Sequence, residues 1–198
     1  MSTATKLRLL PGLNFPDEIS PDVYLHKDQI IKPDESFVIS RDNQGNALSQ
    51  YKDKTWDLSP YSSSVKETSL FDFTHDFLSP DYIQEIKRIL FMTMLYGRGR
   101  KGSCLSVITL YRYFRILNKL AEFSYKNSIS INNLLSNKKL LFQVVIEKNL
   151  TKITNLFNIL FKIGSKRSGL DIQRNKKLIN SIFELERIKK KNEKQTAV

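Results

Sequence analysis

The sequence predicts a mainly α-helical protein, in which an extended arm and a small β-hairpin precede a bundle of four to five helices. Two patterns indicate this class. From residue 79 onward, apolar residues recur at helical spacing in successive segments that end at Gly, Ser or Asn. Before residue 79, proline is frequent, and two short β-prone runs bracket a turn sequence. The 198 residues, 40% of them hydrophobic, are enough for one core with a smaller unit attached.

Residues 1–35 are predicted to form the extended arm. Proline lacks a backbone N–H and keeps the residue before it out of the helical conformation, so repeated prolines oppose both helix and sheet. The segment is also rich in Asp and Ser. Its prolines are Pro11, Pro16, Pro21 and Pro33.

Residues 36–78 are predicted to form the hairpin and a connector. The first strand runs from Ser36 to Arg41, the turn is 43–46 (Asn-Gln-Gly-Asn), and the second strand runs from Ala47 to Leu58. Two strands of this size are marginally stable alone, so we expect them to pack on another part of the chain.

The helical domain is predicted to span residues 79–190. Its first helix has Ser79 as N-cap and Pro80 at the first helical position, and it ends at the basic turn 97–102. Ser103 is expected to restart the chain as a long helix over 105–125. One face of this helix carries Leu110, Phe114, Leu117 and Ala121, and another carries Arg112, Arg115, Lys119 and Glu122.

Shorter helices are expected to follow. Ser130 is placed to cap a helix through Leu135, and Asn137 to begin another toward Lys148. An apolar stripe then ends at Gly164 and Gly169; its members are Leu150, Ile153, Leu156, Phe157, Leu160 and Ile163. A last helix begins near residue 170 or 171, with Leu178, Ile182, Leu185 and Ile188 facing inward.

The charge is divided unevenly along the chain. Lys and Arg number 32 against 20 Asp and Glu, a net charge of +12. Residues 1–78 hold 8 basic and 12 acidic side chains, whereas residues 79–198 hold 24 basic and 8 acidic side chains. A half-chain of +16 attracts polyanions through phosphate contacts and counterion release. Nucleic acid is favoured over an anionic membrane surface, because Lys and Arg are spread over several expected helices with no lipid anchor or interfacial helix. The sequence also contains neither a bilayer-spanning apolar run nor a secretory signal.

Independent enzymatic activity is not expected. His26 and His75 lie far from any second ligand at metal-binding spacing, and neither a Walker-type phosphate loop nor a Gly-x-Ser-x-Gly element occurs. We therefore assign no catalytic residue, metal, cofactor or small-molecule substrate. The single cysteine, Cys104, cannot form an internal disulfide, which fits a reducing cytoplasm.

The first candidate DNA contacts lie at the basic turn and the start of the second helix. Glycines let a main chain approach a phosphate backbone closely, and a helix N-terminus offers free N–H groups and a positive dipole end. The candidates are Arg98, Arg100, Lys101, Ser103 and Ser106. Alanine at both Arg98 and Arg100 is expected to weaken binding across sequences.

The second group recurs along the long helix at Arg112, Arg115 and Lys119. Such a row can face a groove of DNA or can be a solvated helix surface, and the charge of the half-chain favours binding. An Arg112→Ala change is expected to alter sequence preference.

The third group brackets the glycines that end the apolar stripe. It consists of Lys162, Lys166, Arg167 and Arg174. The alternative for Lys162 and Lys166 is a favourable interaction with the negative end of a helix dipole, which needs no ligand. Both interpretations stay open.

One set of motifs runs from the first expected helix to the short element after the second: Ser79-Pro80-Asp81, the basic turn, Ser106-Val107-Ile108-Thr109-Leu110 through Phe114, Leu120-Ala121-Glu122-Phe123, and Ile129-Ser130-Ile131 to Leu135. This segment resembles the core-binding domain of tyrosine recombinases, the phage-integrase family. Upstream, Asn43-Gln44-Gly45, Gln50-Tyr51-Lys52-Asp53 and Trp56-Asp57-Leu58-Ser59-Pro60-Tyr61 resemble the lead-in of long integrases of mobile elements. Residues 191–198 resemble the linker into their catalytic domain.

The resemblance implies a SAM-like helical bundle that forms half of a clamp around double-stranded DNA. In this family a following domain carries an Arg, a Lys, a His-x-x-Arg pair, a further His or Trp and a nucleophilic Tyr. None of these can be placed here, so the resemblance implies a non-catalytic piece of a recombinase that acts in DNA integration and recombination, with self-association on DNA left open. The alternatives are a helical protein–protein adaptor and a small stand-alone DNA-binding regulator of a mobile element.

Overall fold

The computed structural model describes residues 33–62, 69–99, 103–150, 152–171, 180–184 and 187–188. Most of the predicted arm and the whole predicted linker at 191–198 lie outside these ranges. So do three predicted contact residues, Arg100, Lys101 and Arg174, and two residues predicted to face inward, Leu178 and Leu185.

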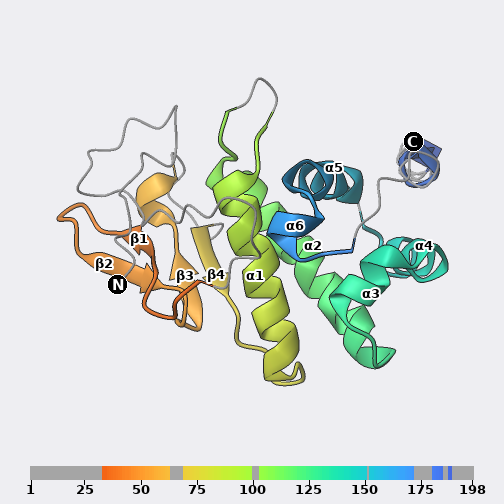
Figure 1. Ribbon diagram of the computed structural model, residues 1–198, viewed down its shortest axis with the longest axis horizontal. Helices are drawn as coiled ribbons and strands as arrows, with labels where there is room; N and C mark the ends of the chain where they lie inside the picture. The colour runs from red at the N-terminus through yellow and green to blue at the C-terminus, as the bar shows by residue number, and fades with distance from the viewer. Residues whose placement is uncertain are drawn as a thin grey trace, which may run out of the picture.

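The described chain is mainly helical, with two small sheets before the helices, which confirms the predicted class (Figure 1). The strands are β1 (Val38–Arg41), β2 (Ala47–Gln50), β3 (Thr55–Asp57) and β4 (Leu70–Asp72). The helices are α1 (Pro80–Tyr96), α2 (Val107–Lys126), α3 (Ile131–Ser136), α4 (Lys138–Glu147), α5 (Ile153–Ile163) and α6 (Ser165–Ser168), with a 3-10 turn at Ser59–Tyr61. Residues 180–184 and 187–188 are also helical.

The helix starts follow from local capping. Ser79 is the N-cap of α1, with Pro80 at the first position as predicted. Ser130 Oγ accepts a hydrogen bond from Asn133 N at the start of α3, and Asn137 Oδ1 accepts from Lys139 N and Leu140 N at the start of α4. All three predicted helix starts are confirmed. Ser130 and Asn137 bond to backbone N–H groups within the next three residues, whereas Ser79 makes no side-chain capping hydrogen bond.

The predicted restart at Ser103 was wrong. α2 begins at Val107, and its N-cap is Ser106, whose Oγ accepts from Thr109 N. Ser103 instead closes the preceding turn, because its carbonyl accepts from Gly99 N at 2.7 Å. Two serines stand three residues apart here, and the backbone pairing of the turn decides which of them caps the helix.

The predicted single hairpin is in fact two antiparallel pairs. β1 pairs with β2, and β3 pairs with β4. The predicted second strand, 47–58, was therefore wrong as one strand: it is divided by a turn at 51–54, where the Asp53 carboxylate accepts from Gln50 N at 2.7 Å. The predicted 43–46 turn is present, with Asp42 Oδ1 accepting from Gln44 N and Asn46 N. These hydrogen bonds hold the pKa of Asp42 below its usual value, the Asn46 side chain contributing most.

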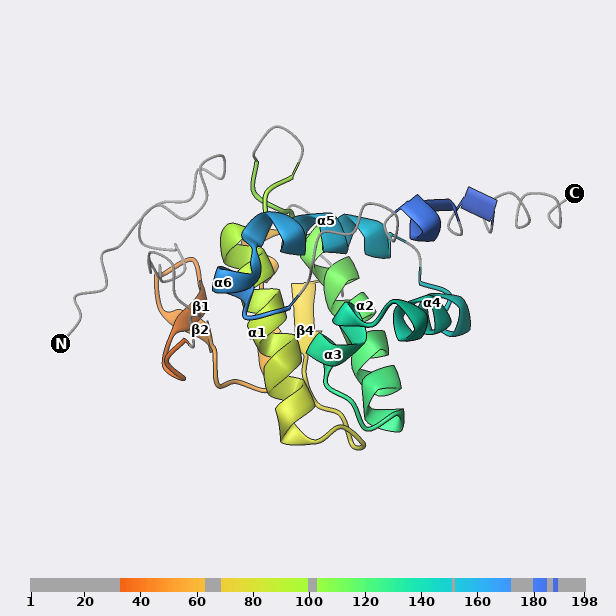
Figure 2. The same ribbon diagram turned by 45° about the vertical axis from the view of Figure 1, so that its right-hand side comes forward.

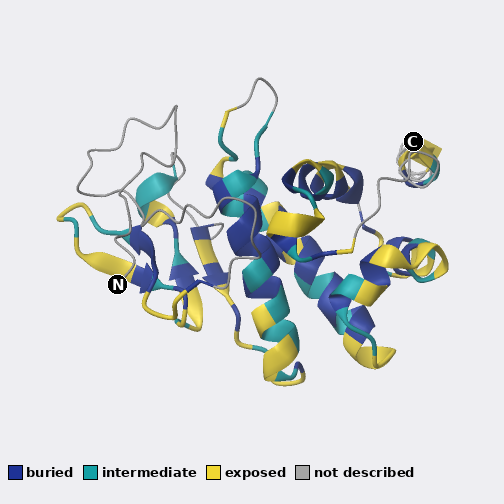
Figure 3. Cartoon of the chain, in the orientation of Figure 1, coloured by how far each residue is buried: buried dark blue, intermediate teal, exposed yellow. Residues whose placement is uncertain are grey.

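The β segment packs on the helices, as expected of so small a unit. The Phe37 and Tyr51 rings contact Phe91 of α1 at centroid distances of 5.1 and 5.6 Å. Phe73 contacts Phe114 of α2 at 5.1 Å. One buried cluster therefore runs from the strands through α1 and α2 to α5, and it appears as the dark blue centre of Figure 3.

The C-terminal helical residues match the prediction only in part. Ile182 is buried at 1% exposure and joins the core, but Ile188 is 52% exposed and does not face inward. Of the four residues predicted to face inward, the structure thus confirms Ile182 and contradicts Ile188.

Candidate nucleic-acid interface

A basic groove lies between α2 and the connection from α4 to α5. Its volume is about 240 Å³. Four of its lining residues are cationic, and none is acidic. The lining residues are Arg112, Arg115, Ile116, Lys119, Asn149, Leu150 and Lys152. Three predicted contact residues are thus brought together in one concave surface.

One side of the groove, the α2 wall, is formed by the basic residues that helical spacing places on one face of α2. Arg112, Arg115 and Lys119 are separated by three and four residues, so they share one face of the helix. The opposite side is anchored in the core, where Leu117 and Ala121 are fully buried. Arg112 and Arg115 are exposed and Lys119 is half-buried. The predicted division of α2 into an apolar and a basic face is confirmed.

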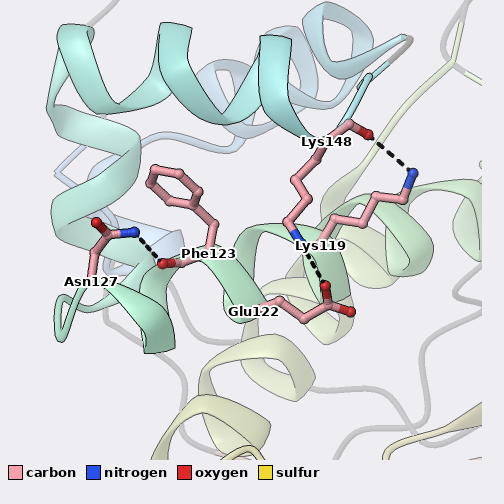
Figure 4. A network of polar contacts seen from close by, with 5 residues as sticks. All are labelled: Lys119, Glu122, Phe123, Asn127 and Lys148. Carbon is pink, nitrogen blue, oxygen red and sulfur yellow. Dashed lines mark hydrogen bonds and ion pairs between the residues drawn. The ribbon is translucent and has the colours of Figure 1, made fainter.

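The other side of the groove is the connection from α4 to α5. It is held against α2 by two polar contacts (Figure 4). Lys119 Nζ donates to the Lys148 carbonyl at 3.2 Å, and Lys148 Nζ forms an ion pair with Glu122 at 3.0 Å. Glu122 therefore balances the charge of Lys148 rather than that of the groove cations. The charges of Arg112, Arg115 and Lys152 stay on the exposed surface.

The connection from α4 to α5 is tight and left-handed at two points. Asn149 has φ +48° and Lys152 has φ +65°, while Leu150 between them is buried at 2% exposure. Leu150 N donates to the Val145 carbonyl at 3.1 Å. Because Leu150 is anchored inward, Lys152 stands exposed at the N-cap of α5, beside the groove.

The groove lies between two stretches of chain without carboxylates. The sequence has no Asp or Glu between Glu85 and Glu122, nor between Glu147 and Asp171. The first stretch supplies the α2 wall and the second supplies Lys152. The lining of the groove therefore carries four cationic side chains and no carboxylate, a charge distribution that favours phosphate binding.

Arg98 lies at the C-terminus of α1 rather than in the groove. Its guanidinium donates to the carbonyls of Leu95 at 3.0 Å and Gly97 at 2.9 Å. Gly97 itself is buried, and a Cβ there would stand 2.2 Å from the Thr93 carbonyl oxygen, so only glycine fits. Arg98 also pairs with Cys104 in a β-bridge, and burial raises the pKa of the Cys104 thiol. Arg98 thus ends α1, and alanine there would disturb the helix end as well as any phosphate contact.

The two predicted serines differ in their roles. Ser103 is exposed in the turn, and the hydroxyl of Ser106 is engaged in capping α2. Neither serine lines the groove.

The third predicted group lies at the other end of α5. Lys162 occupies the last turn of α5, and Lys166 and Arg167 lie on α6; all three are exposed. The Arg167 guanidinium lies over the Tyr96 ring at 5.2 Å from its centroid. α5 has 11 residues and thus separates this group from the groove by roughly 16 Å. The dipole interpretation of Lys162 is compatible with this position, so both readings stay open.

Lys152 and Asn149 were missed by the sequence analysis. Asn is common in the left-handed position that ends a helix, so the end of α4 at Asn149 could have been read locally. The nearness of both residues to α2 could not, because the groove joins residues about thirty to forty positions apart in the chain.

Two features are absent from the residues that the structure describes. No helix among them is long and apolar enough to cross a bilayer. The same residues contain no group of three or more His, Cys, Asp or Glu side chains that could hold a metal ion.

Comparison with known proteins finds no matching family model, curated protein or solved structure. The resemblance to tyrosine recombinases stays a prediction.

Proposed function

We propose that this protein binds double-stranded DNA through the basic groove. The observation that carries the proposal is the convergence of Arg112, Arg115, Lys119 and Lys152 on one concave surface built from two carboxylate-free stretches. Guanidinium and ammonium groups held in this way bind phosphate oxygens and release counterions from the duplex.

The finer proposal rests on the sequence resemblance. We propose that the chain is the core-binding part of a site-specific tyrosine recombinase, that it acts in DNA integration and recombination, and that it is not catalytic by itself. The gene tests this directly: codons for an Arg, a Lys, a His-x-x-Arg pair and a Tyr nucleophile should follow in frame beyond Val198. A regulator of a mobile element would instead end without them.

A concave basic surface also favours DNA binding over a protein–protein adaptor. An adaptor needs a contiguous apolar patch. The large apolar residues that are exposed within the described ranges are spread over strands, helices and loops: Leu48, Leu70, Phe77, Tyr125, Ile146, Phe183 and Ile188. Of these, Phe77 and Tyr125 lie together, with ring centroids 6.5 Å apart.

The test is fluorescence anisotropy with a short labelled duplex between about 50 and 200 mM salt. The wild type should bind more weakly as salt rises. Replacing both Arg112 and Arg115 by alanine should reduce the slope of log K against log salt by about 2, since each lost phosphate contact removes about 0.9.

The matched control is Lys52→Ala with Lys54→Ala, two exposed cations on the 51–54 turn. It removes the same charge and should leave the slope near the wild-type value. Equal effects of the two pairs would show that net charge, and not the groove, drives binding. A wild type that binds no duplex at low salt would sink the proposal and leave an acidic protein as the partner to test.

A further inference from the structure

α5 presents a narrow polar face on a deeply anchored helix. Its exposed members are Asn155, Asn158 and Lys162. At 100° per residue these three fall within about 60° of arc. The rest of the helix circumference is inserted in the core; its buried residues are Ile153, Thr154, Leu156, Phe157, Ile159, Leu160 and Ile163.

The exposed face of α5 begins beside the groove. Lys152, at the N-cap of α5, lines the groove, and the exposed row begins one turn later at Asn155. Both ribbon views place α5 at the upper edge of the helical part, beside the ends of α1 and α2 (Figures 1 and 2).

α5 differs from the other long helices in its chemistry. α1, α2 and α4 each contain at least one carboxylate, whereas α5 contains none. Its exposed face offers two primary amides between two cations. An Asn amide can donate to N7 and accept from N6 of adenine at the same time, and this pair of contacts is available only in the major groove.

We propose that α5 enters the major groove of DNA as the sequence-reading helix, with Asn155 and Asn158 contacting adenines. This inference rests on the proposed DNA binding. Lys152 and Lys162 are ten residues apart, or roughly 15 Å along the axis, so each cation reaches the phosphates of one of the two strands that border a groove about 12 Å wide. The arginines of α2 then hold the adjoining backbone.

The first test selects bound duplexes from a random-sequence library with the wild-type protein. The wild type should enrich a motif that contains at least one invariant adenine. Replacing that adenine by 7-deazaadenine removes N7 without changing base pairing, and it should lower affinity by roughly 5- to 150-fold. Unchanged affinity for the 7-deaza duplex would overturn the inference, and this arm does not depend on the folding of any variant.

The second test compares Asn155→Ala with Asn158→Ala, as a double variant, against Gln143→Ala, an exposed amide on α4. The double variant should lose the adenine preference but keep the wild-type salt slope on non-specific DNA, because the phosphate contacts are intact. The Gln143 variant should keep both. Retention of the motif by the double variant would refute the inference.

The two proposals fail differently. If the wild type binds duplex DNA with a steep salt slope but enriches no motif, DNA binding through the groove is supported and sequence reading by α5 is refuted. If the wild type binds no duplex, both proposals are refuted.

Discussion

Lys87 is a charged side chain inside the core. The residue is 3% exposed, and its ammonium donates to the carbonyls of Tyr51 at 3.1 Å, Lys52 at 3.2 Å and Asp53 at 2.7 Å. All three of its hydrogens are thereby satisfied. The ammonium also lies over the rings of Tyr51, Trp56 and Phe73 at 5.9, 5.9 and 5.1 Å. Burial lowers the pKa of Lys87, and the carboxylates of Asp53 and Glu35 oppose this shift. The contacts fasten the 51–54 turn onto α1.

Lys87→Met should destabilise the protein by about 1–3 kcal/mol, because it leaves three carbonyls of the 51–54 turn without their donor. The change keeps an unbranched side chain, one atom shorter, and removes its charge. Urea unfolding measures the loss. Lys54→Met, at an exposed position on the same turn, should stay within about 0.5 kcal/mol of the wild type. Similar losses in both variants would mean that the Lys87 contacts add little.

Tyr51 makes the folding stability depend on pH in the alkaline range. Burial raises the pKa of Tyr51 to about 12, from an ordinary value of 10.0. Between these values the unfolded chain releases the phenol proton while the folded chain keeps it, so stability is present below pH 10 and is lost as pH rises toward 12. Lys87 acts in the opposite direction, because its pKa is lowered in the folded state.

Tyr51→Phe should therefore lose less stability between pH 9 and 11.5 than the wild type, by roughly 2 kcal/mol. Comparing the two proteins at each pH cancels the contribution of Lys87. The measurement is the midpoint of urea unfolding across this range. Parallel pH curves for the two proteins would show that the Tyr51 phenol ionises equally well when folded.

At the scale of elements, α3 depends on a cap from another helix. It has six residues, too few to be stable alone. Glu85 of α1 accepts from Ile131 N at 2.9 Å and Asn132 N at 2.8 Å, one bond to each carboxylate oxygen. Ser130 Oγ accepts from the next N–H, that of Asn133. The first three N–H groups of α3 are thus satisfied, and two of them depend on α1.

Glu85→Gln should destabilise the protein by about 1–2 kcal/mol, because an amide keeps one acceptor oxygen and loses the charge that strengthens both bonds. Thermal unfolding measures the stability, and hydrogen exchange should show faster opening at 131 and 132. Gln84→Ala, at an exposed neighbouring position, should change neither. Unaltered exchange at α3 in the Glu85 variant would mean that local capping by Ser130 is sufficient.

At the scale of the whole molecule, the strands and helices share one core. Trp56 is fully buried and is the single tryptophan of the chain, and it contacts both Tyr51 and Phe73. Phe73 in turn packs on α2. A unit that shares its aromatic core in this way has no interior of its own.

Tryptophan fluorescence and far-UV circular dichroism should therefore report the same urea transition, since Trp56 reports on the β segment and the dichroism on the helices. Lys87→Met should shift both signals together. A tryptophan transition that precedes the helical one would instead show that residues 36–78 unfold as a separate unit.

Local chemistry determined the helices that the sequence alone could predict. Ser130 and Asn137 accept hydrogen bonds from N–H groups within three residues, Pro80 follows Ser79 at the first position of α1, and the apolar stripe of α5 repeats within its own turns. Ser103 and Ser106 were both possible N-caps of α2. Because the Ser103 carbonyl pairs with Gly99 N, Ser106 caps the helix. The basic face of α2 was predictable for the same reason: spacing along one helix fixes it.

Tertiary structure decided the remainder, because it depends on residues distant in the chain. β3 pairs with β4, with Thr55 opposite Asp72. The Lys87 ammonium donates to carbonyls 34 to 36 residues earlier in the chain. The excess of basic residues after residue 79 predicts an affinity for polyanions. Only packing of the α4–α5 connection beside α2 turned them into a groove, since a single helix face is convex and needs a second wall to enclose a phosphate.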